Sequence, residues 1–135
     1  MERTSKKLTR TDVQNFKLRL EAERQETVRL LAELEQERRL VTHDGPEDAG
    51  DASVTTLARE SLFERTSQKN RQLSRINIAL RRIGSGQFGV CSECGEPINR
   101  KRLEAMPWTT YCLQCQEELE RAHTSQRFVG VELQE

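Results

Sequence analysis

Four cysteines in two closely spaced pairs are the residues of this sequence most able to do chemistry. The pairs are Cys91-Ser92-Glu93-Cys94 and Cys112-Leu113-Gln114-Cys115, separated by 17 residues. Two residues between paired thiols let both thiols reach one ion, and four thiolates satisfy tetrahedral zinc. The pattern therefore predicts one zinc ion bound by Cys91, Cys94, Cys112 and Cys115. A redox dithiol or a disulfide pair is the alternative interpretation.

The surroundings of the pairs fit a structural rather than a catalytic metal. Gly95 directly follows the second cysteine, where a tight turn needs a positive φ. The second pair precedes a predicted helix from Gln116 to about Gln126, whose free N–H groups favour thiolates. His43 and His123 are not expected to be ligands, because the cysteine set is complete. Four protein ligands leave no position for water, and no nucleophile–base pair is visible, so we predict that the chain is not an enzyme.

The composition restricts what can position this zinc. Of the 135 residues, 34% are hydrophobic and 33% are charged, against about 45–50% and about 25% in ordinary globular domains. This excludes a compact enzyme domain and favours long solvated helices, with the zinc compensating for a small core. The 22 basic and 22 acidic residues cancel, so no general attraction to nucleic acid or membranes is indicated. Without an apolar run of spanning or signal-peptide type, the chain is expected to be cytoplasmic, with no membrane association.

Two helical segments precede the cysteines. Thr9 or Thr11 is expected to cap the first, which lacks Gly and Pro from about residue 11 to 41. Mostly apolar residues recur at heptad spacing in both segments, and the second set has two polar interruptions. The positions are Val13, Leu20, Thr27, Leu34 and Val41, then Leu62, Thr66, Lys69, Leu73, Ile76, Leu80 and Ile83. A polar break with two glycines and one proline separates the segments. Their equal lengths predict an antiparallel hairpin, with a three-helix bundle as the alternative.

The sequence thus predicts a mainly all-α fold in four parts. Residues 1–10 form a basic N-terminal segment, and residues 11–83 form an antiparallel coiled-coil hairpin with an acidic tip at 43–53. Residues 84–126 form a four-cysteine zinc-finger module with a C-terminal helix. Residues 127–135 are predicted to be a short tail.

Beyond the cysteine pairs, two short motifs carry a family resemblance. They are Phe88-Gly89-Val90-Cys91-Ser92-Glu93-Cys94-Gly95 and Arg102-Leu103-Glu104-Ala105-Met106-Pro107. Together with the second cysteine pair and the long hairpin, they resemble the DksA/TraR family of bacterial transcription regulators. The resemblance implies a protein that binds RNA polymerase and inserts its hairpin tip into the secondary channel, the pore that leads to the active site, to modulate initiation.

The resemblance also assigns roles to individual residues. The family tip carries an Asp-x-x-Asp-x-Ala motif, which is matched here by Asp48 and Asp51, with Ser53 in place of the alanine. DksA-type members use basic residues to form a site for guanosine tetraphosphate at the polymerase interface. Arg75 keeps one such position, whereas Met106 and Gln116 replace the other two, which predicts weak binding of this anion.

A basic stripe on the second helix is the predicted docking face. Arg71, Arg75 and Arg82 lie within about 40° of one another at about 100° per residue, and guanidinium groups suit an acidic protein rim. A merely solvated face is the alternative. We expect a monomer without direct sequence-specific DNA binding. Two other functions stay open: a zinc-ribbon module that binds nucleic acid in a salt-dependent way, and a homodimeric coiled-coil assembly protein.

Overall fold

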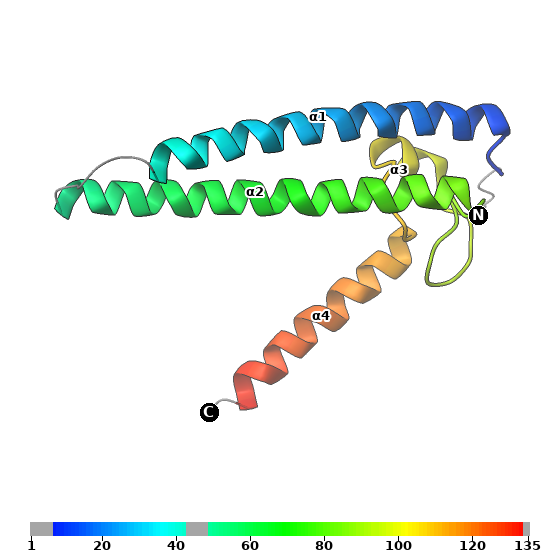
Figure 1. Ribbon diagram of the computed structural model, residues 1–135. Helices are drawn as coiled ribbons and strands as arrows, with labels where there is room; N and C mark the ends of the chain where they lie inside the picture. The colour runs from blue at the N-terminus through cyan, green and yellow to red at the C-terminus, as the bar shows by residue number, and fades with distance from the viewer. Residues whose placement is uncertain (1–6, 43–48, 134–135) are drawn as a thin grey trace.

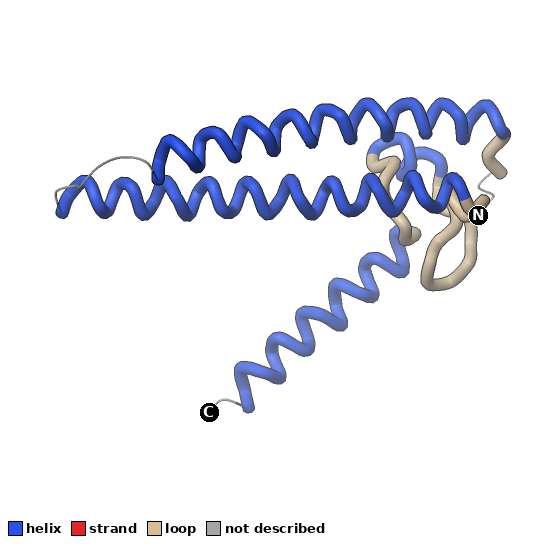
Figure 2. The backbone as a smooth tube through the Cα atoms, viewed as in Figure 1, coloured by secondary structure: helices blue, strands red, loops and turns tan. Residues whose placement is uncertain are grey.

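The computed structural model describes residues 7–42 and 49–133, with side chains described for 7–41 and 54–124. Its helices are α1 (Arg10–Thr42), α2 (Ala49–Gly84), α3 (Arg100–Ala105) and α4 (Leu113–Leu133). Helices α1 and α2 lie side by side as a long antiparallel hairpin, a small module that contains α3 sits at its base, and α4 projects away (Figures 1 and 2). The predicted fold class is therefore confirmed. Among the described residues, none of the helices is both long and apolar enough to span a membrane.

Helix α1 begins with a reciprocal capping arrangement. The backbone N–H of Asp12 donates to Thr9 Oγ1 at 3.1 Å, and the N–H of Thr9 donates to Asp12 Oδ2 at 3.0 Å. Two N–H groups without a helical partner are thereby satisfied, which fixes the start of the helix. Of the two cap residues that the sequence allowed, the structure selects Thr9.

The predicted heptad seam forms the interface between α1 and α2. Leu20, Leu34, Leu62 and Ile76 are buried along it. Thr27 occupies a seam position although it is polar, and it is only 2% exposed. Its hydroxyl donates to the carbonyl of Glu23 at 2.8 Å, so no buried donor is left without a partner.

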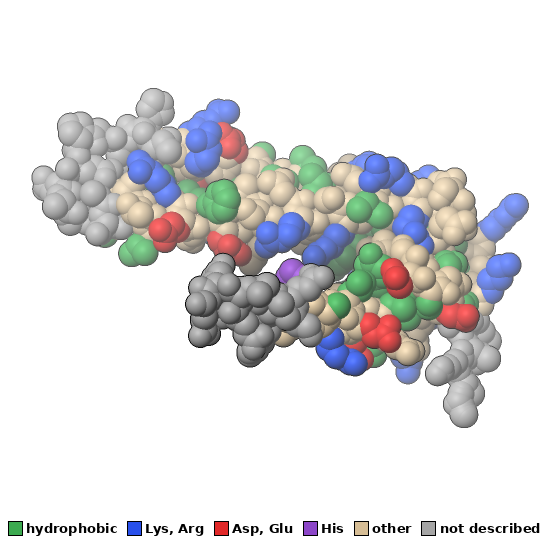
Figure 3. All heavy atoms as spheres, turned by 90° about the horizontal axis from the view of Figure 1, so that it is seen from below, with side chains coloured by type: hydrophobic (Ala, Val, Ile, Leu, Met, Phe, Trp, Pro, Cys, Tyr) green, Lys and Arg blue, Asp and Glu red, His purple; other side chains and the backbone are tan. Residues whose placement is uncertain are grey.

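A second cluster of buried side chains joins the hairpin to the module at its base. Phe16 of α1 packs against Phe88 of the module, with ring centroids 5.4 Å apart, and Ile98 and Leu103 belong to the same cluster. Figure 3 shows hydrophobic side chains gathered at this end, whereas charged side chains of both signs are spread along the hairpin. The module is therefore packed onto the hairpin rather than tethered to it.

Gly89 stands at the closest approach of this junction. Its φ is +84°, and a Cβ atom at this position would lie 2.8 Å from Leu8 Cδ1. The backbone conformation favours glycine here, and a larger residue would also displace the end of the Leu8 side chain. This explains the glycine of the Phe-Gly-x-Cys motif in physical terms.

Two helix boundaries differ from the sequence prediction. Helix α2 begins at Ala49, so Asp51 lies in its first turn rather than in a loop that lasts to residue 53. Helix α4 continues to Leu133, through the segment predicted as a tail. Gly50 and Gly130 lower helix propensity by about 1 kcal/mol each, which favoured a late start for α2 and an early end for α4, but neither segment contains a proline that would stop the helix.

Candidate metal centre

The four cysteine sulfurs converge on one point. All four Sγ atoms lie within 4.8 Å of one another, and the Sγ atoms of Cys94 and Cys112 are 3.9 Å apart. Zinc–sulfur bonds of about 2.3 Å in a tetrahedron place the sulfurs about 3.8 Å apart, whereas a disulfide needs about 2.05 Å. All four cysteines are free thiols. The arrangement therefore fits a zinc ion and contradicts the disulfide alternative.

Each pair is held by a different local structure. The first pair sits in a knuckle, in which the N–H of Gly95 donates to the carbonyl of Cys91 at 3.0 Å. Gly95 has a φ of +76°, as the tight turn requires. In the second pair, Cys112 precedes α4 and Cys115 lies in its first turn, where the N–H of Cys115 donates to the Cys112 sulfur at 3.5 Å. Helix α4 therefore presents its N-terminal N–H groups to the metal centre.

The protonation of the thiols shows why a cation belongs here. Burial opposes ionisation of Cys91, but backbone N–H groups of Cys94, Cys112 and Glu93 lower the pKa of its thiol to about 6. The pKa of Cys115 is raised instead, first by its hydrogen bond to Cys112 and then by burial. Four thiolates this close repel one another unless a cation neutralises them. Zn²⁺ supplies that charge, and a full set of four protein ligands makes the site structural.

The cysteine set is complete within the described residues. No other group of three or more His, Cys, Asp or Glu side chains converges there in metal-binding geometry. His123 is exposed on α4, and His43 lies outside the described residues. Among the described residues, the four sulfurs converge without His123.

An arginine from α2 holds the first knuckle. Arg82 donates to the hydroxyl of Ser92 at 2.9 Å and to the carbonyl of Gln87 at 3.0 Å, and it also bonds the carbonyl of Val90, next to Cys91. Its side chain is half-buried. Arg82 thus ties the end of the hairpin to the metal centre, which the sequence prediction of a docking role did not anticipate.

A second arginine holds the approach to the second pair. Arg102 of α3 donates to the carbonyl of Tyr111 at 3.1 Å and to Thr109 Oγ1 at 3.4 Å. Tyr111 directly precedes Cys112, so the guanidinium group restrains the backbone that delivers this ligand. Groups in this position orient metal ligands and influence metal affinity.

We therefore expect Arg102→Gln to speed the loss of zinc. The amide cannot span the two acceptors that the guanidinium group joins, and lost outer contacts of this kind typically cost about 10–100-fold in metal affinity. Transfer of zinc to a chromogenic chelator measures the effect. The control is Lys101→Gln, since Lys101 is exposed on the same helix. Equal transfer rates for the two variants would remove this role of Arg102.

One ion pair and one hydrogen bond join the module to the first helix. Arg100 of α3 bonds Asp12 of α1 at 2.8 Å, and Arg19 of α1 bonds the carbonyl of Glu104. The pKa of Asp12 is lowered, chiefly by the Thr9 backbone N–H, with Arg100 contributing. One carboxylate therefore serves both the helix cap and the junction.

The remaining predicted site residues lie apart from the zinc. Arg71 and Arg75 are exposed on α2, and Arg71 has only a weak surface pair with Glu64 at 4.0 Å. Asp48 lies outside the described residues, and for Asp51 and Ser53 the structure describes the backbone of α2 alone. The start of α2, which contains Asp51 and Ser53, lies at the opposite end of the hairpin from α3 and the module at the base (Figure 1).

Comparison with known proteins agrees with this geometry. The family described as "Prokaryotic dksA/traR C4-type zinc finger" matches residues 86–121, which contain all four cysteines. The RNA polymerase-binding transcription factor DksA of Caulobacter vibrioides is 37% identical over 111 residues, which are 78% of this chain and 74% of that protein. An uncharacterized protein of Aquifex aeolicus is 41% identical over 76 residues, but these cover only 52% of its length.

A solved structure extends the similarity to the whole fold. Transcription factor DksA2 from Pseudomonas aeruginosa aligns with a TM-score of 0.75 at 27% identity, over 85% of this chain and 88% of that one. Both the hairpin and the zinc module are needed to reach such coverage, since the zinc-finger match alone spans residues 86–121. With this fold, the four-cysteine centre and the Caulobacter relative, the chain belongs to the DksA/TraR family.

Proposed function

We propose that this chain is a cytoplasmic transcription factor that binds RNA polymerase and inserts its hairpin tip into the secondary channel to modulate initiation. The Caulobacter relative, 37% identical over 78% of this chain, is named an RNA polymerase-binding transcription factor. That similarity supports the partner. The finer mechanism rests on the shape of the molecule and on the residues at its tip.

The separation between tip and base is the observation that carries the proposal. Helices of 33 and 36 residues are about 50 Å long at a rise of about 1.5 Å per residue. Two packed helices form a rod only about 20 Å across, because each is about 10 Å wide. Such a rod can enter a pore while the wider zinc module stays outside. In this proposal the zinc module and the hairpin flanks dock, and the tip acts.

The zinc has a supporting role in this proposal. Four thiolates fill its coordination, so it offers no position for a substrate. It stabilises the base from which the hairpin projects, through Arg82 and the Arg100–Asp12 pair. The proposed activity is therefore to bind the polymerase and to influence initiation through the charge of the hairpin tip, rather than to catalyse a reaction.

A single chain is enough for this function. Leu20, Leu34, Leu62 and Ile76 are buried by the pairing of α1 with α2 within one molecule, so the seam does not need a second copy. We propose a monomer, with no sequence-specific contact to DNA. The zero net charge supports the absence of a strong general attraction to nucleic acid.

Guanosine tetraphosphate is expected to contribute little. Arg75 is exposed and able to meet an anion, but Met106 is half-buried and uncharged. The amide of Gln116 already donates to the carboxylate of Glu120 at 3.0 Å. A site with one cation where DksA-type members have three, and with a carboxylate beside it, should bind a polyanion weakly.

The test of the proposal is binding of purified chain to core RNA polymerase. We expect a complex that survives competition by excess linear DNA. If bare DNA displaced the chain from the polymerase, the zinc module would instead be acting as a nucleic-acid binder. A stable homodimer without affinity for the polymerase would favour the assembly role.

The exposed arginines Arg71 and Arg75 should contribute to docking. Reversing both to glutamate should weaken polymerase binding about 10-fold or more, because complementary charge across an interface becomes repulsion. Helicity should change little, since both side chains are exposed. The control Arg10→Glu with Arg121→Glu changes the net charge equally at exposed positions elsewhere. Affinity equal to the parent's at low salt would exclude this face from the interface.

A further inference from the structure

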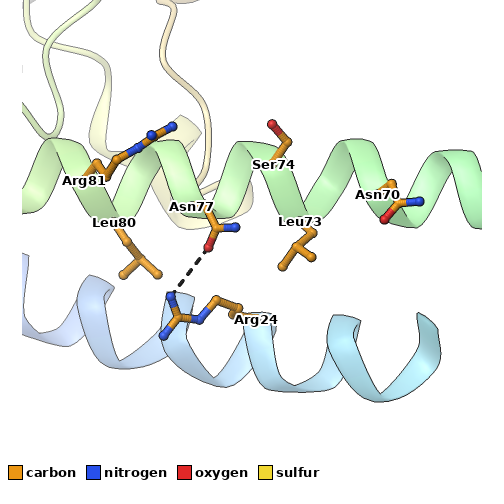
Figure 4. Close-up of a pocket in the computed structure, with 7 residues that line it drawn as sticks. All are labelled: Arg24, Asn70, Leu73, Ser74, Asn77, Leu80 and Arg81. Carbon is orange, nitrogen blue, oxygen red and sulfur yellow. Dashed lines mark hydrogen bonds between the residues drawn. The ribbon is translucent and has the colours of Figure 1, made fainter. Parts of the chain in front are cut away.

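A polar groove runs along one side of the hairpin, away from the residues used so far. It has a volume of about 650 Å³ and is lined by α2, with Arg24 as the contribution of α1. Figure 4 shows Leu73 and Leu80 pointing from α2 toward α1. Arg24 reaches from α1 to Asn77 and donates to its side-chain oxygen at 3.5 Å. At about 100° per residue, Asn77 lies about 120° around α2 from Arg71 and about 160° from Arg75, and Arg81 lies about 80° and about 120° from them, so the groove faces a different side of α2.

The polar side chains of the groove follow a regular pattern. Asn70, Ser74, Asn77 and Arg81 succeed one another at spacings of four, three and four residues. They form a second stripe on α2 beside the apolar seam. Positions beside a coiled-coil seam usually carry charges that pair across the two helices, as Arg65 and Glu37 do nearer the tip at 3.4 Å. In the groove, the amides of Asn70 and Asn77 and the hydroxyl of Ser74 occupy these positions instead of charged side chains.

The groove carries a positive charge that no acidic residue of its own lining neutralises. None of its lining residues is acidic. Arg29, on the outer face of α1, bonds both Glu26 and Glu33, whereas neither Arg24 nor Arg81 forms an ion pair among the described side chains. Both arginines are exposed. The lining of the groove therefore contains two guanidinium groups, and its other polar groups are neutral and can both donate and accept.

This chemistry suits an anionic group with hydrogen-bonding neighbours. Arginine binds a carboxylate with two parallel hydrogen bonds, and amides suit the backbone on either side of it. Single-stranded nucleic acid would need aromatic side chains on which bases stack, and the groove has none. We propose that this groove docks a protein segment of RNA polymerase that presents an acidic side chain to Arg24 and Arg81. The inference rests on the proposed function and adds a second docking face to it.

The first experiment compares affinities for core polymerase. The double variant Arg24→Gln with Arg81→Gln should bind about tenfold more weakly, because the carboxylate of the partner loses both cations. The control Arg29→Gln with Arg121→Gln removes the same charge outside the groove and should bind like the parent. The deficit should shrink as salt is raised, since exposed charges are screened. Circular dichroism checks that both variants keep the helicity of the parent. We expect this because Arg24 loses only one long hydrogen bond, 3.5 Å from Asn77.

The second experiment identifies the occupant. A photo-crosslinking amino acid at Ser74, which points away from α1 in Figure 4, should label a polymerase peptide that contains Asp or Glu. Labelling of nucleic acid, or no labelling in a complex that forms normally, would overturn the proposal. So would a double variant that binds like the parent, although the proposed function would stand. If the parent chain itself failed to bind polymerase, both would fall together.

Discussion

Replacing Cys112 with serine should remove the zinc and unfold the base of the molecule while leaving the hairpin largely helical. Structural zinc contributes about 10–16 kcal/mol of apparent binding free energy, which becomes folding free energy where no site exists without the metal. Few other interactions stabilise the module, because it has few buried side chains of its own. The seam of the hairpin, with Leu34 and Leu62, lies outside the module. The hairpin should therefore stay folded when the metal is lost.

Three measurements check this expectation. Metal analysis should give about one zinc per parent chain and far less for the variant. The near-ultraviolet signal of Trp108 and Tyr111, both of which pack against the base cluster, should collapse, whereas far-ultraviolet helicity should fall only in part. The control is Leu113→Ser, because Leu113 is the exposed neighbour of Cys112. A Cys112→Ser protein that kept its zinc and its aromatic signal would contradict the assignment of the ligands.

Replacing Asp48 and Asp51 with asparagine should abolish the effect on transcription initiation while affinity for the polymerase stays near normal. Most contact area in the proposed complex comes from the flanks and the base, so two tip carboxylates remove little of it. Their charge acts where the hairpin ends, about 50 Å from the base. Asparagine keeps the size and shape of aspartate, so we expect the stability to change by less than about 0.5 kcal/mol.

In vitro transcription at matched occupancy separates these two effects. Glu60→Gln with Glu118→Gln is the control, because it removes two exposed carboxylates away from the tip and should regulate like the parent. A tip variant that still regulated at full strength would refute the role of the two acids. A tip variant that failed to bind would make the tip part of the docking surface.

The zinc ligands and the hairpin could be predicted because both depend on spacing along the chain. Two residues between paired thiols bring both sulfurs to one ion whatever surrounds them. A heptad pattern likewise specifies which side chains meet, and Leu20 and Ile76 are fully buried as that pattern predicts. The heptad pattern and the cysteine spacing do not show by themselves that the hairpin and the zinc module form one fold. The family resemblance supplied that expectation.

The contacts at the base could not be predicted from the sequence, because they join residues far apart in the chain. Arg100 meets Asp12 across 88 positions, and Arg19 meets the carbonyl of Glu104 across 85. The sequence placed Arg82 with Arg71 and Arg75 on a basic stripe. In the structure its side chain instead binds Ser92 and the carbonyl of Val90 in the first knuckle. Helix spacing fixes a direction around the axis but says nothing of what lies in that direction.

Site-specific cross-linking can test the proposed entry of the hairpin tip into the secondary channel of RNA polymerase. A photo-crosslinking amino acid at Ala49, where α2 begins, should label polymerase peptides that surround the active site. The same amino acid at Arg121, exposed on α4, should label none of those peptides. Labelling from Ala49 that fell only on the outer surface of the polymerase, in a complex of normal affinity, would contradict entry of the tip into the channel.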